Sequence, residues 1–152
     1  MGKYQATVEW SRGDANFLDN KYSREHKWHF DGGVTLEGSS SPHVVPVPYS
    51  NASAVDPEEA LIVALASCHM LSFLYVAAQR GFVVDEYRDE AVGRMGKTSA
   101  GKAWVSEVTL NPKVRFSGEK VPGAAEIHAL HHQAHEECFI ANSVKTDVRI
   151  AD

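Results

Sequence analysis

The stretch DPEEALIVALASCHMLSFLYVAAQR, residues 56–80, is the strongest structural signal in the chain. It begins with helix-start signals, because Asp56 can cap the N-terminus, Pro57 fits the first helical position and Glu59 completes a capping box. Gly81 follows the stretch and is a good C-terminal stop. The pattern predicts one helix that is apolar on nearly every face, which is typical of a helix buried inside protein.

A membrane-spanning helix is the alternative interpretation of this stretch. Residues 60–78 are about long enough to cross a bilayer at 1.5 Å rise per residue. Polar side chains nevertheless cluster at what would be the bilayer centre, namely Ser67, Cys68, His69 and Ser72. No other part of the sequence resembles a second span. We therefore expect a buried helix and no membrane partner.

Size and charge limit the other classes of function. A chain of 152 residues predicts a single domain, residues 1–152, with a substantial core. The net charge of -5 and the lack of a long basic run argue against a nucleic-acid partner. The first residues, MGKYQATVEW, lack the apolar core of a secretory signal, so we expect a cytoplasmic protein whose thiols are kept reduced.

The rest of the chain reads mainly as strands. Alternating or β-branched stretches predict strands at residues 4–10, 24–30, 82–95, 102–116 and 143–150, and residues 31–38 predict a turn followed by a short strand. A loop rich in serine and proline covers residues 38–54, and a second helix is predicted at 124–138. This order predicts an α+β fold, with two principal helices against a mainly antiparallel sheet.

The two cysteines leave several interpretations open. Cys68 lies in the apolar helix, where a free cysteine commonly packs like a small hydrophobe. Cys138 lies at the end of the second predicted helix. The two could form a redox pair or no pair at all, and a structural disulfide is disfavoured in a cytoplasmic chain.

Four histidines offer a different chemistry. His128, His131, His132 and His135 follow one another at i, i+3, i+4 and i+7, and so share one helix face. Such pairs can bind zinc, and Cys138 follows three residues later. The chain has no HExxH order and no CxxC, so we expect no metal and no other cofactor, with a His/Cys metal protein as an alternative.

Taken together, these patterns indicate a family. DPEEALIVALASC, residues 56–68, followed by AHEEC, residues 134–138, resembles the OsmC/Ohr family of thiol peroxidases. In that family the helix begins Asn-Pro-Glu, the reactive cysteine follows ten residues after the glutamate, and a second helix bears a cysteine. REHKWHFDGGVTLEG, residues 24–38, aligns with the family segment that carries the active-site arginine. The resemblance implies an OsmC-like fold and an intertwined homodimer.

The resemblance also implies roles for individual residues. Cys68 would attack the peroxide and become a sulfenic acid, and Cys138 would resolve it as a Cys68–Cys138 disulfide. Arg24, rather than Arg12, would stabilise the thiolate, and Glu58 would orient the guanidinium. Two positions depart from the family pattern, since His69 and Phe139 stand where Phe and Pro are frequent.

The same comparison implies the reaction partners. The substrate would be an organic hydroperoxide, with hydrogen peroxide a weaker one, bound by apolar side chains of the helix such as Leu65, Leu71 and Phe73. The reductant would be an external dithiol, in this family typically a lipoylated protein. The alternative on the same fold is a non-enzymatic redox-sensing or ligand-binding stress protein.

Helix geometry adds an argument that is independent of the family. Glu58 and Cys68 are ten residues apart, which is about 15 Å along a continuous helix. A carboxylate from a second copy of the chain could approach Cys68 more simply than Glu58 of the same chain. We therefore expect a homodimer with an active site at its interface.

Overall fold

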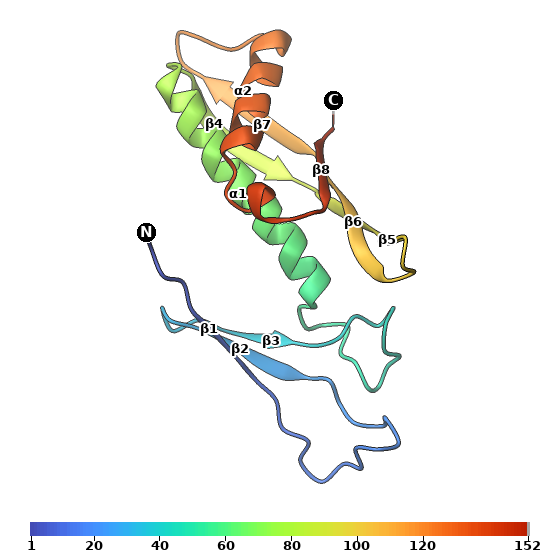
Figure 1. Cartoon of the computed structure of the whole chain (residues 1–152). Coiled ribbons are helices and arrows are strands. Elements are labelled where there is room, and N and C mark those ends of the chain that lie inside the picture. The colour runs from blue at the N-terminus through green and yellow to red at the C-terminus, as the bar shows by residue number, and fades with distance from the viewer. Residues whose placement is uncertain (152) are drawn as a thin grey trace. The chain divides into compact units, whose positions relative to one another are not determined.

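The computed structural model describes residues 1–151 and contains two compact units, Met1–Ala60 and Leu61–Asp152. The elements in chain order are β1 (Ala6–Glu9), β2 (His26–Phe30), β3 (Thr35–Gly38), α1 (Pro57–Gln79), β4 (Val83–Asp89), β5 (Val92–Lys97), β6 (Ala103–Leu110), β7 (Pro112–Ser117), α2 (Ala124–Glu137), the 3-10 turn η1 (Ala141–Ser143) and β8 (Asp147–Ile150) (Figure 1). Two principal helices and mainly antiparallel strands confirm the predicted α+β class.

The first unit is a small antiparallel sheet with the strand order β1-β2-β3. Its buried side chains are polar, namely Ser39, Ser41, Ser50 and Asp56. None of the hydrophobic side chains in residues 1–60, all of which are described, is buried. A segment of this size without an apolar core needs further contacts for its stability.

Helix α1 begins and ends as its sequence predicts. The Glu59 amide donates to Asp56 Oδ1 at 2.8 Å, and the Asp56 amide donates to Glu59 Oε2 at 3.2 Å, which completes the capping box. At the other end Gly81 adopts φ 78°, and the Phe82 amide donates to the Ala77 carbonyl at 3.0 Å. This left-handed glycine ends the helix without the steric cost that a Cβ would add.

The second unit has two apolar clusters along α1. The first cluster contains Phe73, Val76, Ala77, Phe82, Leu130 and Ala134, with residues of β4 and β7 packed against it. The second contains Leu65, Val108 and Leu110, with residues of α1, β6 and β8 around it. The clusters join α1 to α2 and to both sheets of the unit, and they position Cys68 between them.

One face of α1 is left uncovered. Val63, Leu71 and Tyr75 are each about 60% exposed and follow one another at helical spacing together with the exposed Ser67. By length and composition α1 could cross a membrane, but its side chains form the core of the second unit. An apolar face of this kind on a core helix is typical of a surface that is covered by another protein.

Two strand predictions are wrong in extent. Residues 102–116 are not one strand but two, β6 and β7, and residues 82–95 likewise form β4 and β5. The break occurs where Pro112 offers no amide hydrogen and the Asn111 amide turns to donate to Asp89 Oδ1 at 2.7 Å. As a result β4 pairs with β7, whereas β5 pairs with β6 in a different sheet.

The last strand is shorter than predicted and runs in an unexpected direction. β8 begins at Asp147 rather than Ser143, because η1 occupies residues 141–143. It pairs with β6 in parallel, in the order β5-β6-β8. The parallel pairing places Ile150 beside α2, where it contributes to a cavity described below.

Candidate functional site

The structure brings the two cysteines together. Cys68 lies in the middle of α1, and Cys138 is the C-cap residue that directly follows α2. Both thiols are free, and they lie within hydrogen-bonding contact of each other. Two side chains that are 70 positions apart in the sequence thus meet because α1 and α2 pack against each other.

The two thiols have different surroundings. Cys138 is 1% exposed, and its Sγ accepts a hydrogen bond from the Ala141 amide at 3.5 Å. Burial raises the pKa of the Cys138 thiol, and contact with Cys68 raises it further, although the Ala141 amide opposes both effects. Cys68 is only half-buried. Cys138 therefore stays protonated and enclosed at neutral pH, while Cys68 is the thiol that a small molecule can reach.

A cavity of about 510 Å³ opens at Cys68. Its other walls are Leu71, Ser72, Tyr75, Glu137, Phe139 and Asn142. This volume falls within the usual range for small-molecule sites, and three of the side chains are large and apolar or aromatic. The arrangement can hold a compact organic molecule against an accessible thiol.

Only one of the predicted substrate-binding side chains lines this cavity. Leu71 does so, whereas Leu65 and Phe73 are fully buried in the two apolar clusters of the unit. Phe73 stacks on the ring of His131 with a centroid separation of 4.3 Å, so it faces α2. The rotation of α1 thus gives Leu65 and Phe73 packing roles in this structure.

Sequence reasoning missed several of the cavity walls. Tyr75 could have been found, because Leu71, Ser72 and Tyr75 follow Cys68 at i+3, i+4 and i+7 and so share its helix face. Phe139 and Glu137 flank Cys138 in the sequence. Their place at the cavity depends on where α2 ends, which the sequence alone leaves open to within a few residues.

Arg24 lies in the first unit, held in one orientation. Its Nη1 donates to the Asn20 carbonyl at 2.7 Å and to the Tyr22 carbonyl, and its guanidinium lies 3.7 Å from the centre of the Tyr22 ring. Asn20 adopts φ 61°, a left-handed conformation that asparagine tolerates. Arg12 is exposed, and among residues 1–151 its side chain donates only to the nearby Ala15 carbonyl. Of the two arginines, Arg24 is the one whose guanidinium is pre-organised.

Glu58 lies in the first turn of α1. The helix is continuous from Pro57 to Gln79, so Glu58 and Cys68 of the same chain are about 15 Å apart along its axis. Glu58 Oε2 is buried and has no hydrogen-bond partner among residues 1–151. A buried carboxylate oxygen without a donor carries an uncompensated desolvation free energy. Glu58 Oε2 is therefore a candidate acceptor for a donor that residues 1–151 of the same chain do not supply.

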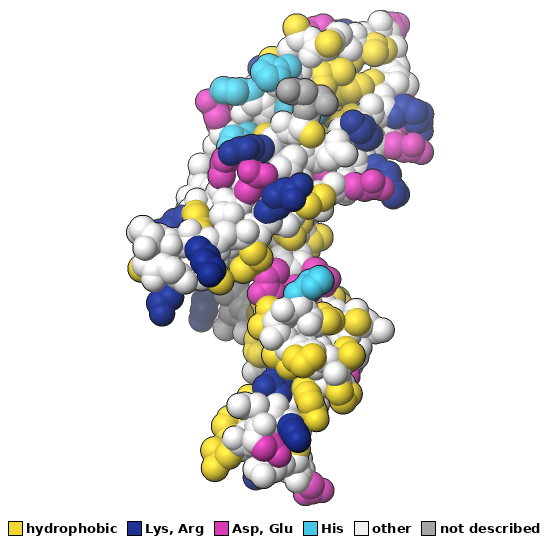
Figure 2. Space-filling view, turned by 90° about the vertical axis from the view of Figure 1, so that its right-hand side faces the viewer, with side chains coloured by type: hydrophobic (Ala, Val, Ile, Leu, Met, Phe, Trp, Pro, Cys, Tyr) yellow, Lys and Arg dark blue, Asp and Glu magenta, His cyan; other side chains and the backbone are white. Residues whose placement is uncertain are grey.

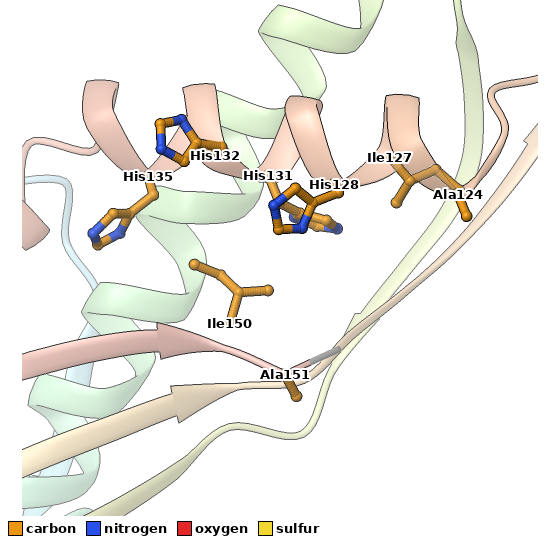
Figure 3. A pocket seen from close by; sticks show the side chains of 8 residues that line it. All are labelled: Ala124, Ile127, His128, His131, His132, His135, Ile150 and Ala151. Carbon is orange, nitrogen blue, oxygen red and sulfur yellow. The ribbon is translucent and has the colours of Figure 1, made fainter.

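A second cavity, of about 500 Å³, contains neither cysteine. It lies between α2 and the C-terminal strand and is lined by Ala124, Ile127, His128, His131, His132, His135, Ile150 and Ala151 (Figure 3). In Figure 2 the histidines of the second unit form a group on the surface. The predicted common face of these histidines is thus present on α2.

His131, the most buried of these histidines, contacts His69 of α1. His131 Nδ1 and His69 Nε2 are 3.0 Å apart, and the two buried rings stack at an interplanar angle of 12°. Burial lowers the pKa of both imidazoles to about 4, and each is also disfavoured as a cation by neighbouring histidines. Both rings are therefore neutral at pH 7, and one donates to the other.

The histidines do not form a metal site in this arrangement. Among residues 1–151, no three side chains of His, Cys, Asp or Glu converge closely enough to hold a metal ion. His131 uses Nδ1 for His69, and Cys138 contacts Cys68 instead of a histidine. The alternative of a His/Cys metal protein gains no support from the geometry.

The α+β fold, with paired thiols on two packed helices, defines a protein of the OsmC-like class. The chain belongs to the OsmC-like protein family, whose model matches residues 50–151. It is 52% identical to an OsmC-like protein of unknown function from Vibrio cholerae, with a TM-score of 0.96 over 99% of both chains. No curated protein matches the sequence.

Structures of organic hydroperoxide resistance proteins share the fold at low identity. The OhrB protein of Bacillus subtilis is 17% identical, with a TM-score of 0.68 over 98% of this chain and 96% of its own. The corresponding protein of Elizabethkingia anophelis is 15% identical, with a TM-score of 0.73 over 99% and 93%. The likeness at these identities concerns the fold alone.

Proposed function

We propose that this protein is a thiol-dependent peroxidase that reduces organic hydroperoxides, with hydrogen peroxide as a weaker substrate. The observation that carries the proposal is the contact between an accessible Cys68 and a buried Cys138 beside a largely apolar cavity. The membership of the OsmC-like family supports it. The two thiols are the redox groups of the proposed reaction, which needs no bound cofactor.

The chemistry proceeds in two steps. The Cys68 thiolate attacks the terminal oxygen of the hydroperoxide, an S–O bond forms, the O–O bond breaks, and the alkoxide leaves and takes up a proton as the alcohol. Cys138 then loses its proton and attacks the sulfenic sulfur, so that a disulfide forms and hydroxide leaves as water. The raised pKa of Cys138 suits this order, because the second thiol stays protonated until the sulfenic acid is present.

A dithiol must restore the two cysteines. It supplies two electrons and two protons and leaves as its own disulfide, and the family resemblance points to a lipoylated protein in the cytoplasm. The apolar cavity beside Cys68 would also admit the hydrocarbon stem of such a dithiol.

The proposed site is completed by a second copy of the chain. The walls of the Cys68 cavity include no lysine or arginine among the described residues, yet a thiolate in apolar surroundings needs a positive charge. We assign this role to Arg24. In the proposed site Glu58 of a second copy orients the Arg24 guanidinium by a bidentate salt bridge. Glu58 Oε2 is available for this contact, because it is buried and has no hydrogen-bond partner among residues 1–151. Each chain, residues 1–152, would act as one OsmC-like domain within the homodimer.

The test compares two cysteine variants. Cys68→Ser should abolish reduction of cumene hydroperoxide, because it removes the attacking thiol. Cys138→Ser should complete one turnover and then accumulate sulfinic acid at Cys68, which mass spectrometry detects. Steady-state turnover by Cys68→Ser near the wild-type rate would reject the peroxidase and leave a redox-sensing or binding protein.

A further inference from the structure

Within one chain, the walls of the Cys68 cavity carry a single charged side chain. Glu137 is the one carboxylate among its walls, and no basic residue lines it in the described part of the chain. The neighbouring walls Leu71, Tyr75 and Phe139 carry no charge at neutral pH. A molecule that approaches Cys68 along these walls therefore meets a negative charge that no other wall of the cavity in the same chain neutralises, whereas the proposed position of Arg24 is at the thiolate.

The surroundings of Glu137 leave that charge in place. Its Oε1 accepts a hydrogen bond from Gln133 Nε2 at 3.2 Å, which is a neutral donor. Across residues 1–151 no arginine, lysine or histidine forms a salt bridge with it. Glu137 is also the last residue of α2, where the carbonyl groups of the helix end contribute further negative potential.

We propose that Glu137 is a specificity-determining residue, and that it directs the Cys68 cavity to uncharged hydroperoxides over those that carry a carboxylate near the peroxide group. The inference rests on the proposed function and deepens it. An uncharged substrate places its hydrocarbon part against Leu71, Tyr75 and Phe139 with no electrostatic cost. A substrate carboxylate in the same cavity is repelled by Glu137.

The size of the effect follows from simple electrostatics. Two carboxylates a few ångströms apart at an exposed site repel each other enough to lower a rate constant about fivefold at low salt. Salt screens this repulsion, because the Debye length falls to about 10 Å at 0.1 M and about 3 Å at 1 M. Discrimination by Glu137 should therefore weaken as the ionic strength rises.

Charge can be tested without changing the shape of the reagent. Iodoacetamide and iodoacetate both alkylate a thiolate, forming an S–C bond as iodide leaves, and they differ by one negative charge. Since the chain has two cysteines, the alkylation rates are measured in a Cys138→Ser background, where Cys68 is the remaining thiol. This readout does not depend on peroxidase activity.

The variants are Glu137→Gln and the matched control Glu136→Gln. Glu136 precedes Glu137 on the same helix, is exposed and does not line the Cys68 cavity. Glu137→Gln should raise the ratio of the iodoacetate rate to the iodoacetamide rate about fivefold at low salt, whereas Glu136→Gln should change it less than twofold. An unchanged ratio in Glu137→Gln, or equal shifts in both variants, would overturn the proposal.

A matched pair of peroxides links this result to catalysis. Cumene hydroperoxide with a para-carboxylate and the methyl ester of the same compound differ mainly in charge. In the chain with both cysteines, the ester should be preferred by kcat/KM, and Glu137→Gln should reduce the preference by a factor similar to that seen in alkylation. Absence of turnover with every peroxide would reject the proposed function, while the alkylation ratio would still decide the role of Glu137.

Discussion

At the residue scale, the clearest functional candidates are side chains that contacts within the chain already hold in one conformation. Arg24 is the clearest example in the first unit, because two backbone carbonyls and the Tyr22 ring hold its guanidinium. Such an arrangement removes conformational freedom from a side chain that would otherwise be mobile. Such ordering is what the proposed contact between the Arg24 guanidinium and a thiolate in a defined geometry requires.

The first prediction concerns this arginine. Arg24→Ala should slow both the reaction of Cys68 with cumene hydroperoxide and its alkylation by iodoacetamide at pH 7 by about tenfold or more, because the variant lacks the positive charge that we propose to stabilise the thiolate. Rapid-mixing kinetics measures the first rate and mass spectrometry the second. Arg12→Ala is the control and should react at the wild-type rate, since Arg12 is exposed and bonds only locally. Equal rates in Arg24→Ala and wild type would remove Arg24 from the site.

At the element scale, the packing of α1 on α2 carries both the thiol pair and the histidine pair. His69 and His131 connect the two helices in the buried region next to Cys68 and Cys138. His69 Nδ1 is buried without a hydrogen-bond partner among the described residues. Two neutral imidazoles at a buried helix contact make that contact sensitive to acid.

The second prediction is a loss of stability in mild acid. In the folded chain burial lowers the pKa of His69 and His131 to about 4, whereas an unfolded histidine titrates near 6.5. As the pH falls from about 6.5 towards 4, the unfolded chain binds protons that the folded chain does not. The contribution of these two histidines to the free energy of unfolding should therefore decrease across this window and change no further below pH 4, as urea titrations at a fixed protein concentration would measure.

Replacing both histidines tests the cause. The double variant His69→Leu, His131→Leu removes both rings together, so no imidazole is left buried without its hydrogen-bond partner. Its free energy of unfolding should decrease clearly less between pH 6.5 and 4 than that of the wild type. His132→Gln removes an exposed histidine from the same helix and should keep the wild-type slope. If the double variant loses stability with pH as steeply as the wild type, the buried pair is not the acid-sensitive contact.

At the scale of the whole molecule, a single chain leaves apolar surface uncovered and a buried polar atom without a partner. The first unit buries no hydrophobic side chain, and α1 exposes an apolar stripe that includes Val63, Leu71 and Tyr75. Glu58 has a buried oxygen without a donor among the described residues. A two-fold interface uses the same surface on both copies. It can therefore cover the apolar stripe and provide a donor for Glu58 in each chain.

The third prediction is a homodimer with shared active sites. Light scattering should give about twice the chain mass of 16.7 kDa. Glu58→Ala and Cys68→Ser should each be inactive as homodimers, because one lacks the orienting carboxylate and the other the attacking thiol. Refolding them together should restore part of the activity, since one site in the mixed dimer then has both groups. A fully active monomer, or no recovery in the mixture, would contradict this arrangement.

The sequence by itself determined the features that depend on neighbouring residues. The start of α1 at Asp56, Pro57 and Glu59, and its end before Gly81, follow from capping groups within a few positions. The α+β class and the family also followed from local patterns and their spacing. Local signals of this kind act over one or two helical turns, which is why they can be recognised without the fold.

Only the tertiary structure decided the features that depend on distant residues. The hydrogen bond from Asn111 to Asp89 divides one predicted strand into β6 and β7, and it joins positions 22 residues apart. Packing against β6 buried Leu65, packing against α2 buried Phe73, and the end of α2 brought Glu137 and Phe139 to the Cys68 cavity. The physical reason is that the rotation of a helix apolar on all sides is fixed by what packs against it, because its own pattern favours no single face.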